Sequence, residues 1–198
     1  MVQSYEGMVK EDSDMTVWNR AFETLAEIVE YGRKKYGDFA PELFILDGST
    51  DFMFDLKIWL DDYMEFLEQE EEQEQLEKVC RKLLKLFAWE KASPSDIRFR
   101  LASSMLSLNK KKEAGDFCER WYGEDENDPA AAAALIYAWI ADRRYKDAQK
   151  VVGFWMDKEG GYTVENAEVF GAAAVLQNVF PGNGKDIQVQ YCSSCNKL

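Results

Sequence analysis

Histidine is absent from the 198 residues of this sequence. Its absence excludes Ser-His-Asp and Cys-His catalysis and every zinc site that uses imidazole. It also removes the general base that enzymes most often use near neutral pH. Chemistry by carboxylates or lysine stays open in principle, but the sequence contains no motif for it. We therefore expect a protein that is not an enzyme and needs no cofactor.

Cysteine, long apolar runs and basic charge are also scarce. Four cysteines are too few for a disulfide scaffold in a chain of this length. The stretch Ala130–Ala141 is shorter than the roughly 18 to 20 apolar residues that cross a bilayer. Acidic residues outnumber basic ones by 37 to 24, and the net charge of -13 repels phosphate backbones and anionic lipids. We expect no nucleic-acid partner, no membrane association and, because Met1–Asp14 lacks a basic and apolar leader, a cytoplasmic location.

Helical periodicity dominates what is present. Hydrophobic residues make up 46% of the chain, enough for a core. One apolar stripe, at spacings of three and four residues, predicts a first long helix over Met15–Tyr36. The segment Asp12–Asp14 should cap its start, and Arg33, Lys34 and Lys35 complement the dipole at its end. Further helices are predicted at 51–70, 73–89 and 163–180, with a single domain over 1–180 and a tail over 181–198.

A repeated pattern occupies the middle of the chain. A capping residue followed by proline occurs at Ser93-Pro94 and again, 35 positions later, at Asp128-Pro129. A step of 34 positions back from the second helix of the first clear unit reaches Cys80, Leu83 and Phe87, which predicts an earlier unit in the same register. The residues that recur 34 positions apart should lie in the core; they are Leu101, Ala114 and Trp121, followed by Leu135, Ala148 and Trp155.

These units resemble tetratricopeptide repeats, which are helix pairs that recur at this spacing. The likeness rests on Leu101-Ala102 in one first helix and on the small residues Ala114 and Ala148 in the second helices, and it covers roughly residues 51–180. It implies an all-α fold, a right-handed superhelix of stacked antiparallel helix pairs, with a long N-terminal helix and a C-terminal closing helix. Repeats of this kind bury their apolar faces against neighbouring repeats. A terminal unit has a neighbour on one side only, so its sequence is expected to differ from the others.

The resemblance also implies a concave binding surface. Its positions are apolar and aromatic here, without the Lys, Arg and Asn by which chaperone-binding members clamp a carboxylate. The implied function is a scaffold or adaptor that binds a peptide or helical segment of another protein, as a monomer or homodimer. The alternative for Ala130–Ala141, which is apolar almost all round, is complete burial. The predicted partner-binding residues are Phe99, Ser103, Leu106, Ala133, Tyr137 and Ile140.

Two other features offer alternatives. The tail carries Cys192 and Cys195 as a CxxC pair, which is half of a four-cysteine zinc site; two tails in a dimer would complete it. The second functional hypothesis is therefore a zinc- or thiol-dependent assembly regulator. Charge is also segregated, with nine acids and no base between Leu60 and Glu77 and basic clusters near Lys111 and Arg144. This segregation indicates either a solvated surface or a charged docking edge.

Overall fold

The computed structural model describes residues 14–48, 55–157 and 162–181 of the chain. Helix accounts for 77% of these residues and no strand occurs among them, which confirms the predicted all-α class. The chain divides into two compact units, Met1–Leu101 and Ala102–Leu198. The helix α6 (Ser95–Ser107) crosses this boundary. The single domain over 1–180 and its superhelical arrangement stay predictions.

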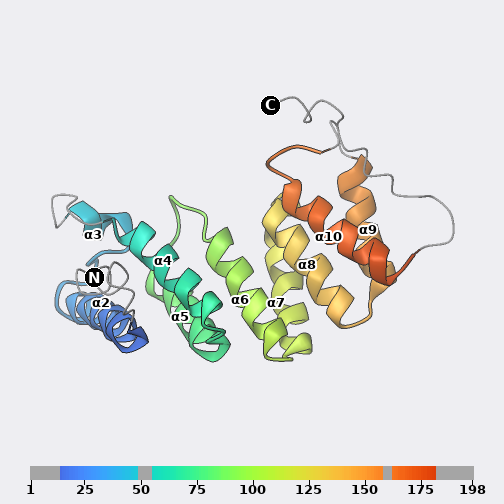
Figure 1. Ribbon diagram of the computed structural model, residues 1–198. Helices are drawn as coiled ribbons and strands as arrows, with labels where there is room; N and C mark the ends of the chain where they lie inside the picture. The colour runs from blue at the N-terminus through green and yellow to red at the C-terminus, as the bar shows by residue number, and fades with distance from the viewer. Residues whose placement is uncertain (1–13, 49–54, 158–161, 182–198) are drawn as a thin grey trace, which may run out of the picture. The chain divides into compact units, whose positions relative to one another are not determined.

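The first unit is built on the long helix α2 (Met15–Tyr36), whose bounds match the prediction. Its start is fixed by Asp14, whose carboxylate accepts a hydrogen bond of 2.8 Å from the backbone N–H of Thr16. Its buried face presents Trp18 to the helix α4 (Leu56–Gln69), where the indole stacks at 5.6 Å on Trp59. The helix α5 (Gln73–Leu86) contacts both α4 and α2, and the short α3 (Phe44–Gly48) rests on α4. Aromatic side chains thus form the centre of this unit, whose helices are drawn in Figure 1.

The second unit surrounds one apolar helix. The helix α8 (Pro129–Ala141) contacts α7 (Lys111–Glu124), α9 (Tyr145–Asp157) and α10 (Ala167–Val179) (Figure 1). Seven of its thirteen residues are buried. The neighbours on several sides explain why its sequence is apolar almost all round, so burial is the outcome for most of Ala130–Ala141. The six core positions predicted from the repeat are all buried: Leu101, Ala114, Trp121, Leu135, Ala148 and Trp155.

Three turns, those between α4 and α5, α6 and α7, and α8 and α9, share one backbone geometry. In each, a residue in the left-handed region follows the first helix, and the next N–H donates to a carbonyl five residues back. This is a Schellman-type helix end, which usually uses glycine at the left-handed position. Here that position is held by Glu71, Asn109 and Arg143, with φ of 57°, 60° and 61°.

The turns correct the predicted repeat register. Asn109 and Arg143 are 34 positions apart, as predicted, but Glu71 and Asn109 are 38 positions apart. The additional four residues lie in the connection between α5 and α6, which runs over 87–94, whereas the connection between α7 and α8 runs only over 125–128. The structural counterpart of Cys118 is therefore Cys80, rather than the residue that a step of 34 positions assigns.

One boundary in each of α4, α5 and α6 differs from the predictions. The helix α4 begins at Leu56 because Asp55 is extended and caps it; residues 51–54 lie outside the described part. The helix α5 ends at Leu86 instead of Trp89, because Phe87 is extended and Trp89 has a φ of 59°. The helix α6 begins at Ser95, one residue after the proline that was predicted to open it.

The closing helix α10 begins at Ala167 rather than Thr163, yet Thr163 still organises its start. The Thr163 N–H donates to the Asn166 side chain at 2.7 Å, and the Asn166 N–H donates back to the Thr163 hydroxyl at 3.3 Å. This reciprocal pair has the pattern of a capping box.

Candidate functional site

The predicted partner-binding residues fall on α6 and α8, and their exposure differs. Phe99, Leu106, Tyr137 and Ile140 are each partly accessible, as predicted, and Ser103 is exposed. Ala133 is fully buried, so the prediction that it lines a binding surface is wrong. Its methyl group belongs to the core of the second unit. Phe99 lies in the first unit, while the other five residues lie in the second.

Tyr137 meets the closing helix at a glycine. Its hydroxyl oxygen lies 3.7 Å from the position that a Cβ atom on Gly171 would occupy. Burial raises the pKa of the Tyr137 hydroxyl, and the nearby Glu168 carboxylate raises it further. One helical turn after Gly171, Val175 is 38% exposed. We call Tyr137, Ile140, Gly171 and Val175 the α8–α10 surface.

Sequence reasoning identified the α8 part of this surface but missed the α10 part. The helix was predicted only as a closing element, so no role was assigned to Gly171. A signal was present: the run from Gly171 to Val175 is made of small residues and one valine, a composition that permits close approach of another chain.

Arg144, in the basic turn between α8 and α9, is already paired within the protein. The Arg144 guanidinium lies 4.7 Å from the Trp139 ring centre and forms ion pairs with Glu119 and with Asp147. The pKa of the Glu119 carboxyl is lowered, mainly because the carboxylate accepts a hydrogen bond of 2.9 Å from the Trp139 indole N–H. The hydrogen bond from Arg144 lowers this pKa further. The acidic run Leu60–Glu77 contains the α4–α5 turn, which is the counterpart of the two basic turns by backbone geometry. Two carboxylates of the second unit, those of Glu119 and Asp147, therefore balance the positive charge of Arg144.

Neither buried cysteine is available as a metal ligand. Cys80 and Cys118 are free thiols, both fully buried, and burial raises the pKa of each to about 12. Metal binding needs the thiolate, so both would have to ionise in the core. Cys192 and Cys195 lie outside the described residues. Within the described ranges, no group of three or more Cys, Asp or Glu side chains is arranged to hold a metal ion, and no helix is long and apolar enough to cross a membrane.

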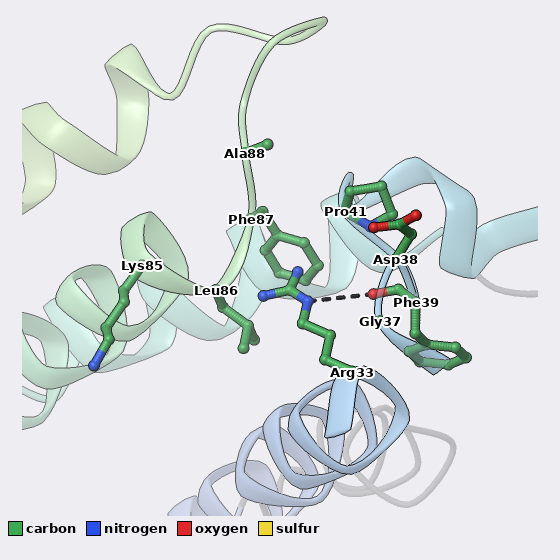
Figure 2. Close-up of a pocket in the computed structure, with 9 residues that line it drawn as sticks. All are labelled: Arg33, Gly37, Asp38, Phe39, Pro41, Lys85, Leu86, Phe87 and Ala88. Carbon is green, nitrogen blue, oxygen red and sulfur yellow. Dashed lines mark hydrogen bonds between the residues drawn. The ribbon is translucent and has the colours of Figure 1, made fainter. Parts of the chain in front are cut away.

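A pocket of about 280 Å³ opens in the first unit. It lies between the C-terminal end of α2, the connector to α3 and the residues that follow α5 (Figure 2). We call it the Arg33 pocket, because the Arg33 guanidinium lies at its centre, 5.9 Å from the ring centre of Phe87. Its lining residues are Arg33, Gly37, Asp38, Phe39, Pro41, Lys85, Leu86, Phe87 and Ala88.

The wall of this pocket comes from the longer α5–α6 connection. The Ala88 N–H donates to the Pro41 carbonyl at 2.9 Å, and the Glu90 N–H donates to the buried Glu42 carboxylate at 2.8 Å. On the other side, Arg33 donates from Nε to the Phe39 carbonyl at 3.2 Å and from Nη2 to the Ala40 carbonyl at 2.9 Å. Sequence reasoning missed the pocket because it assigned Arg33 to the helix dipole alone and assumed an unbroken repeat.

Comparisons with known proteins identify no relative: no family model, no curated protein and no solved structure matches this chain. The resemblance to tetratricopeptide repeats therefore stays a prediction.

Proposed function

We propose that this protein is a non-enzymatic adaptor that binds a peptide or helical segment of another protein on the α8–α10 surface. The observation that carries the proposal is the half-exposed Tyr137 beside the exposed Gly171. A tyrosine ring next to a residue without a side chain offers a flat apolar area that a partner backbone can approach closely. Tyrosine is also one of the residues that most often dominate binding at protein interfaces.

The packing of α8 supports a rigid surface. Its opposite sides are buried against neighbouring helices, so Tyr137 and Ile140 project from a helix held in place by the core. A preorganised surface loses little side-chain freedom on binding.

The charge near this surface favours one kind of partner. The Glu168 carboxylate acts electrostatically on Tyr137. None of the four surface residues is basic, so the surface lacks a clamp for a partner's carboxylate. The favoured partner is a segment with an apolar anchor and a basic residue beside it.

The proposal is tested by site-specific photo-cross-linking in the native host. A photoreactive phenylalanine at Tyr137 should capture one defined partner, whereas the same group at the exposed Tyr36 of α2 should not. The wild-type chain and its variants are then compared for binding of the cross-linked segment, made as a synthetic peptide.

Two variants should weaken that binding without loss of thermal stability. Tyr137→Ala removes the ring, and Gly171→Leu fills the space beside it, where the nearest group is the Tyr137 hydroxyl. The matched control is Gly123→Leu on α7, which also has open space around it. Identical cross-links from Tyr137 and Tyr36, or full binding by both variants, would exclude this surface.

A further inference from the structure

We propose that the Arg33 pocket binds a carboxylate ligand that carries a small apolar group. The proposal is independent of the α8–α10 surface, since the pocket belongs entirely to the first unit.

Within the described ranges, no acidic group neutralises the Arg33 guanidinium. Arg33 is half-buried, and its Nε and Nη2 donate to two backbone carbonyls that orient the guanidinium. Its Nη1 donates to no residue in the described part of the chain, and Arg33 forms no ion pair there. Two carbonyl groups orient a guanidinium without neutralising it. A carboxylate on the remaining N–H groups would supply the missing negative charge.

Cationic side chains outnumber acidic ones among the residues that line the pocket. Lys85 and Asp38 also line it and lie on opposite sides in Figure 2. Lys85 is exposed and forms no ion pair within the described ranges, so its flexible side chain is available to an anion. Two cations against one acid leave the pocket locally positive in a chain whose net charge is -13.

The pocket also has an apolar wall. Phe87 and Leu86 are buried, and with the exposed Pro41 they supply apolar lining to the pocket. A ligand pocket typically combines such a wall with a few placed polar groups. The volume of about 280 Å³ suits a ligand with a single ring or branched aliphatic group. Inorganic phosphate would meet the cations but leave the apolar wall uncovered, so it should bind more weakly.

The pocket is also a product of the break in the repeat. Phe87 and Ala88, which line it, begin the connection that is four residues longer than its counterpart after α7. The additional length lets the chain return to the α2–α3 connector, where Ala88 and Glu90 form their hydrogen bonds. A regular repeat with the shorter connection has no such wall.

The test uses nitrogen-15 NMR titration of the full chain with 3-phenylpropionate and its neutral amide. The acid should shift the backbone amide signals of Phe39, Ala40, Phe87 and Ala88, and the amide and inorganic phosphate should shift them far less. A second pair of probes, acetyl-Ala-Leu with a free or an amidated C-terminus, distinguishes a peptide carboxylate from a small free acid. Equal binding of acid and amide, or no shift with either acid, would overturn the proposal.

Matched variants assign the binding to the two cations. Lys85→Gln should weaken binding of the acid by about threefold, the size expected for one exposed charge. Arg33→Lys removes the planar fork and should weaken it by more than about tenfold. Lys78→Gln, an exposed lysine of α5 outside the pocket, makes the same change in net charge and should leave binding unaltered.

Lys85→Glu covers the case in which Arg33→Lys lowers the melting temperature, because Lys85 is exposed and forms no ion pair within the described ranges. It should abolish binding with the fold intact. Affinities that are the same for Lys85→Glu and Lys78→Gln would show that the acid does not use this pocket.

Discussion

The backbone N–H of Ala88 donates a hydrogen bond of 2.9 Å to the carbonyl oxygen of Pro41, two residues that lie 47 positions apart in the chain. This bond ties the connection after α5 to the connector after α2. Two residues later the Glu90 N–H donates to Glu42, so the longer connection is fixed at two points. The wall of the Arg33 pocket therefore has a defined position rather than that of a free loop.

The Glu42 carboxylate should contribute to stability through its bond to the Glu90 N–H. Glu42→Ala leaves this backbone donor without its acceptor, and we expect a loss of about 1 to 3 kcal/mol in the free energy of unfolding. Glu42→Gln keeps an acceptor oxygen and should recover most of the loss. Urea unfolding of the two variants measures the difference. Equal stability of Glu42→Ala and wild type would show that the bond contributes nothing.

Ala114 and Ala148 should not tolerate larger side chains. Both are fully buried in the second helices of their repeats, so Ala114→Leu or Ala148→Leu forces neighbouring helices apart. The expected loss is about 1 to 3 kcal/mol from overpacking. Gly115→Ala, next to the first site but with nothing within 4 Å of its new Cβ, is the control and should stabilise by about 0.5 to 1 kcal/mol. Thermal melts that rank the three variants otherwise would contradict the packing.

The left-handed turn positions should favour glycine. Glu71 and Arg143 adopt φ of 57° and 61°, where a Cβ atom is strained. Glu71→Gly or Arg143→Gly should raise the free energy of unfolding by roughly 0.5 to 1 kcal/mol, the relieved strain exceeding the added entropy of the unfolded chain. Asn109→Gly should change little, because asparagine already tolerates this region. Chemical denaturation compares all three, and a loss of stability at Glu71 and Arg143 would show that their side chains matter more than their backbone.

The buried thiols should make stability fall at alkaline pH. Burial raises the pKa of Cys80 and Cys118 from 9.0 to about 12, so the folded chain keeps protons that the unfolded chain releases in that range. Each protonated thiol therefore contributes to the free energy of unfolding, and this contribution is fully present below pH 9. It is lost as pH rises toward 12, by up to about 1.4 kcal/mol per thiol and pH unit.

The measurement uses a Cys192→Ser/Cys195→Ser background, in which Cys80 and Cys118 are the remaining thiols. Urea unfolding at about pH 8 and about pH 10 should show a smaller alkaline loss after Cys118→Ala. In the same background a thiol reagent should label neither cysteine until urea is added. Rapid labelling of the folded chain would mean that these thiols are accessible.

The sequence alone determined most of the local structure. The bounds of α2 followed from Asp14, which caps its start, and from Gly37, which ends it with a φ of 69°. The core positions of the two regular units followed from their recurrence 34 positions apart, because units that bury equivalent faces repeat their apolar and small residues in register. The accessibility of Tyr137 was expected from the resemblance to tetratricopeptide repeats, whereas the burial of Ala133 required the position of neighbouring helices.

Only the tertiary structure decided the register of α5 and the existence of the Arg33 pocket. Four additional residues are close to one helical turn of about 3.6 residues, so apolar faces align almost equally well at a spacing of 34 or 38. The left-handed positions in the three turns show that the spacing is 38 residues for the first pair of units and 34 for the second. The pattern of apolar side chains does not distinguish these two spacings. The role of Arg33 is also ambiguous in the sequence, because a cation in the last turn of any helix complements the helix dipole. Its bonds to the Phe39 and Ala40 carbonyls exist because the chain folds back after Gly37, and its contact with Phe87 depends on the distant segment that follows α5.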